Sequence, residues 1–274
     1  MDMVEQERKE LMDKRVQVLK KAILAGAEAI LAINPADVAV IEKTSDSDVV
    51  TTADLNSEEA IVRIIQEAFP EDVIISEEMS EEIQVQLSPE NLPNFTGWII
   101  DPLDGTNSFR YKGSYSGVSI GFIESGKPAI GAICNPFTSE LFFAEEDKGA
   151  TLNGNPIHVS QTQDFKKSTR VVTSNPYEDE KMRENLKRIL KLDPMPWIEV
   201  RGSAVLIMTD VAAGRFDLYE HNGLKPFDNP AGFLIVKEAG GKVVGLKGEE
   251  ISFLSPEVVM GNPVLVDKFI QINA

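Results

Sequence analysis

The chain has 274 residues, enough for one large domain or two small ones, and 42% of them are hydrophobic. Its 44 acidic residues outnumber its 27 basic residues, so the formal net charge is -17 at pH 7. A surface of this charge repels the phosphates of nucleic acids, which argues against direct nucleic-acid binding, and an anionic substrate would need local attraction from cations or backbone N–H groups.

The N-terminal segment predicts a long amphipathic helix. Apolar residues recur at helical spacing between residues 5 and 32. Residues 5–14 are rich in charges and lack the apolar core of a signal peptide, and no apolar run approaches the roughly 20 residues of a membrane span. Cys134 is the only cysteine, so no intrachain disulfide can form. These features predict a soluble, cytoplasmic protein that does not enter a membrane.

The next part of the chain alternates polar stretches with apolar ones. A polar stretch at 42–48 precedes a helix predicted at 57–69, which Pro70 ends. A strand is predicted at 73–76 and a buried strand at 98–100. The segment between them, 79–96, is polar and predicts a loop or a short irregular helix.

From residue 114 onward the patterns favour an antiparallel sheet. Strands are predicted at 118–123, 129–134 and 141–144, with a turn at 124–127 joining the first two. Asn153-Gly154 marks a further turn.

The last part of the chain mixes helices and short strands. A helix is predicted at 178–192, a buried one at 203–213, and another after Asp228. Short strands are predicted at 216–219, 242–245 and 258–260. The order of elements predicts a mixed α+β or α/β chain with a boundary near residue 150. It separates an N-terminal half with the antiparallel sheet (1–150) from a C-terminal α/β half (151–274).

Five acidic residues share one kind of location, because each lies where a predicted strand ends or a helix begins. They are Asp54, Glu77, Asp101, Asp104 and Asp228. Polar groups at such ends can converge on one cleft. Taken singly, Asp54 and Asp228 are also explained as acids at the positive ends of helices, worth about 0.3–1 kcal/mol each.

The segment from Asp101 to Thr106 carries the most specific signal. Two carboxylates three residues apart at the end of a buried strand repel each other unless a cation lies between them. Pro102 between them fixes φ of the turn. The chain has no His/Cys cluster, and a set of oxygen ligands selects Mg²⁺ or Mn²⁺ over zinc. The pattern therefore predicts a metal site.

The reaction that requires this set of residues is metal-assisted hydrolysis of a phosphate ester. Two ions about 3.5–4 Å apart could clamp an in-line displacement, one activating water and the other stabilising the leaving oxygen. Gly105 and Thr106 would offer backbone N–H groups to the phosphate at a helix start. The Thr106 hydroxyl could orient the attacking water and pass a proton towards Asp54. It is also explained as a helix cap, a role that it could fill at the same time.

In this order the motifs resemble those of the inositol monophosphatase family of Mg²⁺-dependent, lithium-sensitive phosphatases. The resemblance covers nearly the whole chain and rests on Asp54, Glu77-Glu78, Asp101 to Thr106, Gly117 to Phe122, Gly202-Ser203-Ala204 and Asp228. It implies a layered α-β-α-β-α sandwich with the site at the junction of the two halves. It also implies a homodimer.

Matching positions imply a set of metal ligands. Glu77, Asp101 and the Leu103 carbonyl would hold a first Mg²⁺ ion, and Asp101, Asp104 and Asp228 a second. Glu77 could share a third, weakly bound ion. The resemblance therefore implies a catalytic role for Glu77 in addition to metal binding.

The resemblance also implies the groups that contact the substrate. Thr106 and Asp54 would activate the nucleophilic water, and Gly105 and Thr106 would bind phosphate. Ala204 lies at the position of a substrate contact.

The identity of the substrate stays open in the sequence. Members of the family hydrolyse inositol phosphates, fructose 1,6-bisphosphate or 3′-phosphoadenosine 5′-phosphate. Where inositol monophosphatases place a sugar-binding Glu, this chain has His221, preceded by Glu220. A small shift would restore a carboxylate through Glu220. Otherwise His221 would hydrogen-bond a different hydroxyl or a second phosphate, or lie in a surface loop.

The residues and the resemblance together predict a hydrolase, a Mg²⁺-dependent phosphomonoesterase acting on inositol monophosphate or a related sugar phosphate. Alternatives within the family are a fructose-1,6-bisphosphatase and a 3′(2′),5′-bisphosphate nucleotidase. An alternative of another class is a non-catalytic acidic protein that uses the same scaffold to bind a partner. A simple divalent-cation binder would explain the acids but would leave Gly105-Thr106 without a role.

Overall fold

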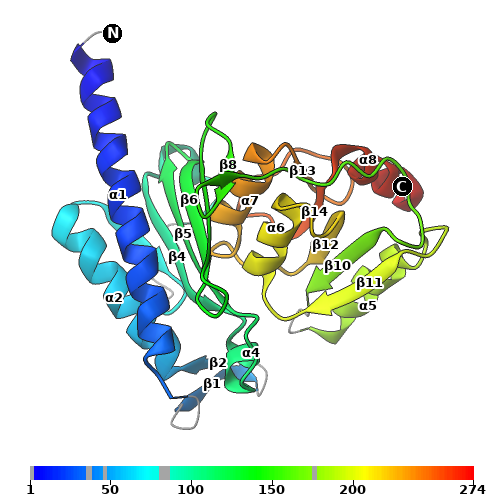
Figure 1. Ribbon diagram of the computed structural model, residues 1–274, viewed down its shortest axis with the longest axis horizontal. Coiled ribbons are helices and arrows are strands. Elements are labelled where there is room, and N and C mark those ends of the chain that lie inside the picture. Colours follow the sequence, from blue (N-terminus) through cyan, green and yellow to red (C-terminus); the bar gives the residue numbers. More distant parts are fainter. Residues whose placement is uncertain (1–2, 35–38, 46–47, 80–86, 175–177) are drawn as a thin grey trace.

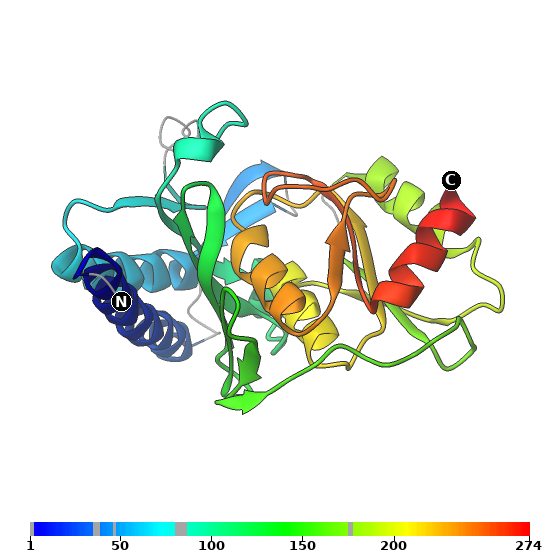
Figure 2. The ribbon, with the colours of Figure 1, turned by 90° about the horizontal axis from the view of Figure 1, so that it is seen from above.

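The computed structural model describes residues 3–34, 39–45, 48–79, 87–174 and 178–274. Helices and sheets alternate in five layers, as Figures 1 and 2 show from two directions. The outer layers and the central layer are pairs of helices, and the two layers between them are sheets. The predicted α-β-α-β-α sandwich is therefore confirmed.

The first helical pair covers one face of a seven-stranded sheet. It consists of α1 (Met3–Leu31) and α2 (Thr52–Ala68). The sheet has the order β3-β4-β5-β6-β7-β8-β9, and only β3 and β4 are parallel. Its strands are β3 (Val73–Ser76), β4 (Gly97–Asp104), β5 (Gly117–Glu124), β6 (Lys127–Asn135), β7 (Glu140–Glu145), β8 (Ala150–Leu152) and β9 (Asn155–Pro156).

The central helices lie between this sheet and a second, five-stranded sheet. They are α6 (Ala204–Ala212) and α7 (Asn229–Glu238). The second sheet has the order β11-β10-β12-β14-β13. Its strands are β10 (Arg170–Ser174), β11 (Trp197–Arg201), β12 (Leu218–Asn222), β13 (Lys242–Val244) and β14 (Glu257–Gly261). On its other face lie α5 (Asp179–Ile189) and α8 (Pro263–Asn273).

Side-chain alternation along the strands explains why each sheet is covered on both faces. On β4, Trp98 and Ile100 pack against the α1/α2 layer, whereas Ile99 between them packs into the apolar cluster around α6 and α7. All three are at most 1% exposed. A strand apolar on both faces must be sandwiched, so the continuous apolar run predicts a central strand.

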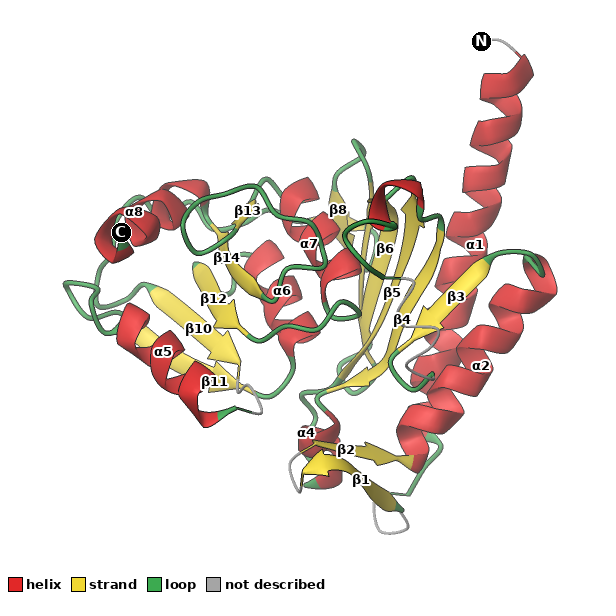
Figure 3. Ribbon diagram, turned by 180° about the vertical axis from the view of Figure 1, so that it is seen from behind, coloured by secondary structure: helices red, strands yellow, loops and turns green. Residues whose placement is uncertain are grey.

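Three small elements complete the first half. The hairpin of β1 (Val40–Ser45) and β2 (Asp48–Thr51) leads into α2, and α4 (Thr106–Arg110) packs beside β2 (Figure 3). A 3-10 turn, η1 (Leu92–Asn94), precedes β4. In the part of the chain that the structure describes, we find no helix apolar and long enough to span a membrane.

Several predicted element boundaries were wrong. The hairpin β1/β2 and the elements β10, β11 and α8 were not predicted, and α2 begins five residues before the predicted start. The strand predicted at 216–219 is β12, which begins and ends later. Part of the segment predicted as a loop or irregular helix, 80–86, lies outside the described residues. The two large sheets divide the chain between β9 and β10, and the predicted domain boundary near residue 150 stays a prediction.

Candidate active site

A bulge in β4 brings Asp101 and Asp104 to the same side of the sheet. Residues three apart on a regular strand point to opposite faces. Here Asp101 lies opposite Ser119 and Asp104 opposite Gly117. β4 therefore advances by three residues over a stretch in which β5 advances by two. The extra residue restores a common direction. Pro102 lies within the bulge, where it has no N–H to lose from the ladder. The two acids lie in the strand itself and not in a turn after it.

Asp228 reaches the same place because α7 packs very closely on the sheet. A Cβ atom on Gly121 would lie 2.8 Å from Pro230 Cβ, and one on Gly131 would lie 2.7 Å from Ala231 Cα. Glycines in β5 and β6 therefore permit the first turn of α7 to touch the strands. Asp228 is the N-cap residue of α7, and its Oδ2 accepts a hydrogen bond from the Lys225 backbone N–H (2.7 Å).

Asp101, Asp104 and Asp228 form a partly buried carboxylate cluster. Each offers an oxygen, and these three oxygens lie within 4.8 Å of one another. Asp101 is 1% exposed; its Oδ1 accepts from the Leu103 N–H (3.0 Å), and its Oδ2 is buried with no hydrogen-bond partner. An orphaned buried carboxylate oxygen facing two further acids is stabilised by a bound cation or by a proton. The donor set therefore fits a hard divalent metal.

The electrostatics of the cluster agree with this fit. Burial is the largest cause that raises the pKa of Asp101, Asp104 and Asp228, and repulsion among the acids of the site raises it further. The pKa of Asp104 rises to about 6, although hydrogen bonds from Ser203 and Val205 lower it. Without a cation the cluster therefore holds protons that ordinary aspartates release.

Asp104 also ties the cluster to α6. Its Oδ2 accepts hydrogen bonds from Ser203 Oγ (2.6 Å) and from the Val205 N–H (2.8 Å) at the start of that helix. Ser203 is the N-cap residue of α6, and its Oγ accepts from the Leu206 N–H (3.2 Å). The same bonds fix the first turn of α6, so Ala204 lines the pocket beside the cluster.

Thr106 and Asp54 form a second polar group next to the cluster. Asp54 closes a capping box at the start of α2, in which its Oδ2 accepts from both the backbone N–H and the hydroxyl of Thr51. Its Oδ1 accepts from Thr106 Oγ (3.0 Å). Burial raises the pKa of Asp54 to about 6, although the bonds from Thr51 and Thr106 lower it. The capping box thus holds one carboxylate oxygen and presents the other to Thr106.

Gly105 and Thr106 begin α4 at the wall of the pocket. Gly105 has φ +83°, and a Cβ there would lie 2.8 Å from the Tyr115 carbonyl oxygen, so only glycine fits. The Leu103 carbonyl accepts from Thr106 Oγ (3.0 Å), an alternative to Asp54 for the single hydroxyl proton. Because a carbonyl oxygen has two lone pairs, Leu103 can still offer one to a metal.

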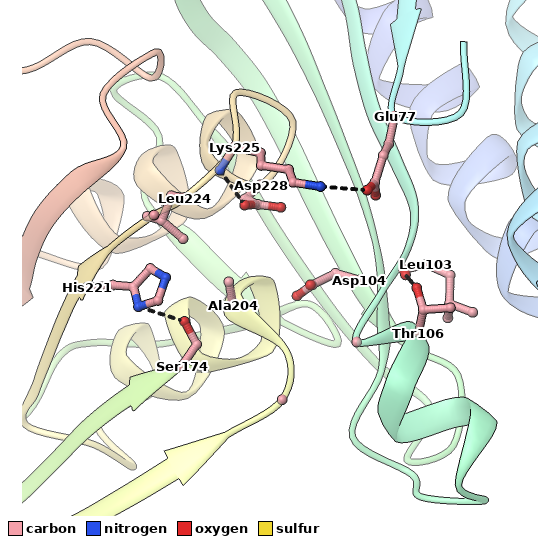
Figure 4. Close-up of a pocket in the computed structure, with 13 residues that line it drawn as sticks. Glu77, Leu103, Asp104, Thr106, Ser174, Ala204, His221, Leu224, Lys225 and Asp228 are labelled. Carbon is pink, nitrogen blue, oxygen red and sulfur yellow. Dashed lines mark hydrogen bonds and ion pairs between the residues drawn. The ribbon is translucent and has the colours of Figure 1, made fainter. Parts of the chain in front are cut away.

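Glu77 lies outside the cluster of three acids but beside Asp101 in the sheet. Its backbone N–H donates to the Ile100 carbonyl (3.2 Å), and its charge raises the pKa of Asp101. It follows β3, and its Oε1 lies 3.5 Å from Lys225 Nζ, which reaches across the pocket from the loop after β12 (Figure 4). The structure thus brings Glu77 to the same pocket as Asp104 and Asp228 but pairs it with a lysine.

His221 and Glu220 occupy opposite faces of β12. His221 lines the pocket, and it stacks beside Tyr219, two residues earlier on the same face. Glu220 points the other way, is 0% exposed, and pairs with Arg188 of α5. The prediction that Glu220 supplies a substrate-binding carboxylate is therefore not supported by its position. His221 is 3% exposed and lies in a strand, which corrects the alternative of a surface loop histidine.

Ser174 and Lys225 also line the pocket, and neither was assigned to the site from the sequence. Ser174 ends β10, and that strand was not predicted. The spacing of Lys225 in the sequence does not separate it from an ordinary surface charge. A prediction of β10 would have placed Ser174 at the end of a strand, the kind of location that the acidic site residues share.

The fold and site together define a class of protein. Two sheets between three helical layers, with partly buried carboxylates at the junction of the sheets, form the architecture of a sugar-phosphatase-like sandwich. The model of the inositol monophosphatase family matches residues 9–272. The chain belongs to the inositol monophosphatase family.

Individual relatives agree with this assignment. The chain is 37% identical over 230 residues to an inositol-1-monophosphatase of Synechocystis, covering 83% of this chain and 77% of the relative. It is 31% identical to a fructose-1,6-bisphosphatase/inositol-1-monophosphatase of Thermotoga maritima, covering 85% of each. The solved structure of the extragenic suppressor protein suhB from Bartonella henselae superposes with a TM-score of 0.80 at 27% identity, covering 96% of this chain and 98% of that one.

Proposed function

We propose that the protein is a divalent-metal-dependent phosphomonoesterase that hydrolyses inositol monophosphate or a related sugar phosphate. The observation that carries the proposal is the partly buried cluster of Asp101, Asp104 and Asp228, with an orphaned oxygen on Asp101, beside the hydrogen-bonded pair Thr106–Asp54. A cation site can stabilise the charge of the phosphate, and a polarised hydroxyl beside it can orient the attacking water, as hydrolysis requires.

The residues that would hold the metal are the three aspartates, the Leu103 carbonyl and Glu77. We propose two or three Mg²⁺ ions, with Mn²⁺ as a substitute, because every donor is an oxygen. When bound, such ions supply Lewis-acid stabilisation of the phosphate and of the nucleophilic water. Lys225 beside Glu77 would have to yield that carboxylate to a metal.

The protein groups would orient the water and the phosphate. With Asp54 accepting its proton, the Thr106 hydroxyl presents its lone pairs to a water and can accept a hydrogen bond from it. The pair then fixes the direction of attack and offers a path for the water's proton. Gly105 and Thr106 offer N–H groups at the start of α4; since this helix has only five residues, these donors matter more than its dipole.

Added Mg²⁺ is expected to stabilise the protein more at about pH 8 than at about pH 5. In the metal-free protein the pKa of Asp104 is raised to about 6, and those of Asp101 and Asp228 are raised as well, above the value of about 3.9 in an unfolded chain. The folded state therefore binds more protons than the unfolded state, and the free energy of unfolding falls as pH rises through this range.

Mg²⁺ replaces these protons on the carboxylates. As the pH rises, fewer protons remain bound to compete with the metal, so the stabilisation by Mg²⁺ increases. The measurement is the unfolding temperature with and without excess Mg²⁺ across this pH range. A Mg²⁺ effect that is equal at both ends would show that the metal does not bind at the cluster.

The proposed activity is tested by release of phosphate from a panel of esters with Mg²⁺. We expect turnover of inositol 1-phosphate or a sugar phosphate, and loss of turnover in excess EDTA. Inhibition by Li⁺ is a further expectation from the family, checked by titration. Turnover that persists in EDTA would exclude the metal-dependent reaction, and stable metal binding without any turnover would favour the alternative of a non-catalytic partner-binding protein.

A second candidate is hydrolysis of fructose 1,6-bisphosphate. It is favoured by His221 in the pocket, where a carboxylate would repel a second phosphate, and by the dual name of the Thermotoga relative. The homodimer, the cytoplasmic location and the absence of direct nucleic-acid binding stay predictions.

A further inference from the structure

We propose that a buried hydrogen-bond relay from Arg188 through Asn185 fixes His221 as a neutral Nε2–H donor that selects substrates with a second anionic group on the leaving alcohol. This inference rests on the proposed phosphatase function and narrows its substrate class, because it favours the second candidate, a bisphosphate, over inositol monophosphate. It concerns the wall of the pocket that faces the carboxylate cluster.

The relay begins at Arg188, whose Nε donates to Glu220 Oε1 and is thereby held in place. The same guanidinium donates from its NH2 group to Asn185 Oδ1 (2.6 Å). A guanidinium can only donate, so the oxygen of the Asn185 amide must face Arg188. Asn185 is 0% exposed in α5, and this contact fixes which way its amide points.

The amide in turn fixes the tautomer of His221. Asn185 Nδ2 lies 3.2 Å from His221 Nδ1, and an amide NH₂ group can only donate. Nδ1 must therefore be the unprotonated acceptor, which leaves the ring proton on Nε2. Ser174 Oγ, 3.1 Å from Nδ1 and 2.7 Å from the Tyr219 hydroxyl, can donate to the same nitrogen.

The ring stays neutral in this setting. Burial lowers the pKa of His221 to about 3, and the positive charges of Arg188 and Lys181 lower it as well. Figure 4 shows the ring edge opposite the Ser174 bond turned towards the pocket. Alternation along β12 places the two neighbouring residues in different roles. Glu220 faces α5 and holds Arg188, whereas His221 faces the pocket and receives the hydrogen bond from Asn185.

A fixed N–H donor selects for acceptors on the substrate. A carboxylate in this place would accept from sugar hydroxyls and repel anions, whereas Nε2–H donates to an anionic oxygen at no electrostatic cost. Lys225 lines the same pocket and adds a positive charge to it, although its ammonium lies beside Glu77. Of the described pocket residues on this wall, none but Asp228 is acidic, and Asp228 belongs to the carboxylate cluster. The leaving alcohol is therefore expected to carry a second phosphate or a carboxylate.

The tautomer can be read directly, because the chain has only two histidines. In protein labelled with ¹⁵N-histidine, the His221 signals should show a protonated Nε2 and an unprotonated Nδ1 near neutral pH. His158→Gln removes the signal of the exposed His158 and thereby assigns the spectrum. Asn185→Asp replaces the donor with an acceptor and should move a proton onto Nδ1. A protonated Nδ1 in the wild type would overturn the proposal.

Selectivity is tested with fructose 1,6-bisphosphate and fructose 1-phosphate, which differ only in the second phosphate. His221→Gln keeps an amide N–H at similar reach, and His221→Glu, of the same shape, replaces it with a carboxylate. The ratio of kcat/KM for the two substrates should fall by about 10- to 100-fold in the Glu variant, the usual value of a hydrogen bond to a charged group. The Gln variant should keep most of the preference, and His158→Gln should keep all of it.

The outcomes separate the two levels of the proposal. Hydrolysis in Mg²⁺ with the same ratio in the Gln and Glu variants, or with no preference in the wild type, would refute the selection by His221 alone. No hydrolysis of any phosphate ester by the wild type would refute the proposed function, and this inference with it. Unfolding temperatures show whether each variant is folded.

Discussion

Replacement of Asp101 with Asn is expected to reduce phosphate release by more than about 1,000-fold, because the substitution removes a ligand from the centre of the proposed metal site and with it several kcal/mol of charge stabilisation. The same substitution is expected to raise the unfolding temperature of the metal-free protein. Asp101 Oδ2 is buried without a partner, and burial and its acidic neighbours raise the pKa of the group, so a neutral amide of the same shape relieves repulsion.

This pair of opposite effects distinguishes a ligand from a structural residue. A residue that only holds the fold together would lose activity and stability in parallel. The measurements are phosphate release and the unfolding temperature with and without Mg²⁺, and the stabilising effect of Mg²⁺ should be lost in the variant. Asp164→Asn is the matched control, since Asp164 is exposed and paired with Lys268 away from the pocket. Full activity of Asp101→Asn would refute the role of the cluster.

The elements that carry the site were predictable where the local pattern is strong. The apolar run before Asp101 is long enough to indicate a buried strand, and the proline and glycines around Asp228 mark the ends of α7. The start of α2 was missed because Thr51 to Asp54 appears polar. That polarity is the capping box itself, in which side chains satisfy the first N–H groups of the helix.

Other features of the site depend on how neighbouring strands pair, which the sequence of a single strand does not reveal. The bulge that turns Asp101 and Asp104 to one side exists only in the register between β4 and β5. In the same way, Glu220 and His221 are neighbours in sequence, yet the pleat of β12 sends them to opposite faces. A one-residue shift between them therefore exchanges a residue that lines the pocket for one that is buried against Arg188 of α5.

Replacement of Thr106 with Val is expected to lower kcat by about 100- to 10,000-fold, the usual contribution of a positioned proton-transfer group, with a smaller change in KM. Valine keeps the shape of the side chain but cannot donate to Asp54 or accept from a water. Thr106→Ser retains the hydroxyl and is the matched control, which should keep most of the activity. Measurement of kcat and KM for the three proteins on one substrate tests this expectation.

The dependence of Thr106 on Asp54 can be separated from a simple capping role by a double-mutant cycle. If the hydroxyl acts through its bond to Asp54 Oδ1, then Asp54→Asn and Thr106→Val break one unit, and the double variant should be little slower than either single variant. If Asp54 matters only because its Oδ2 caps α2, its substitution should lower the unfolding temperature, and its effect on kcat should multiply with that of Thr106→Val. Losses of kcat that multiply in the double variant would therefore refute the proposed pair. If both groups serve one proton path, the first substitution already abolishes that path and the second has little left to remove.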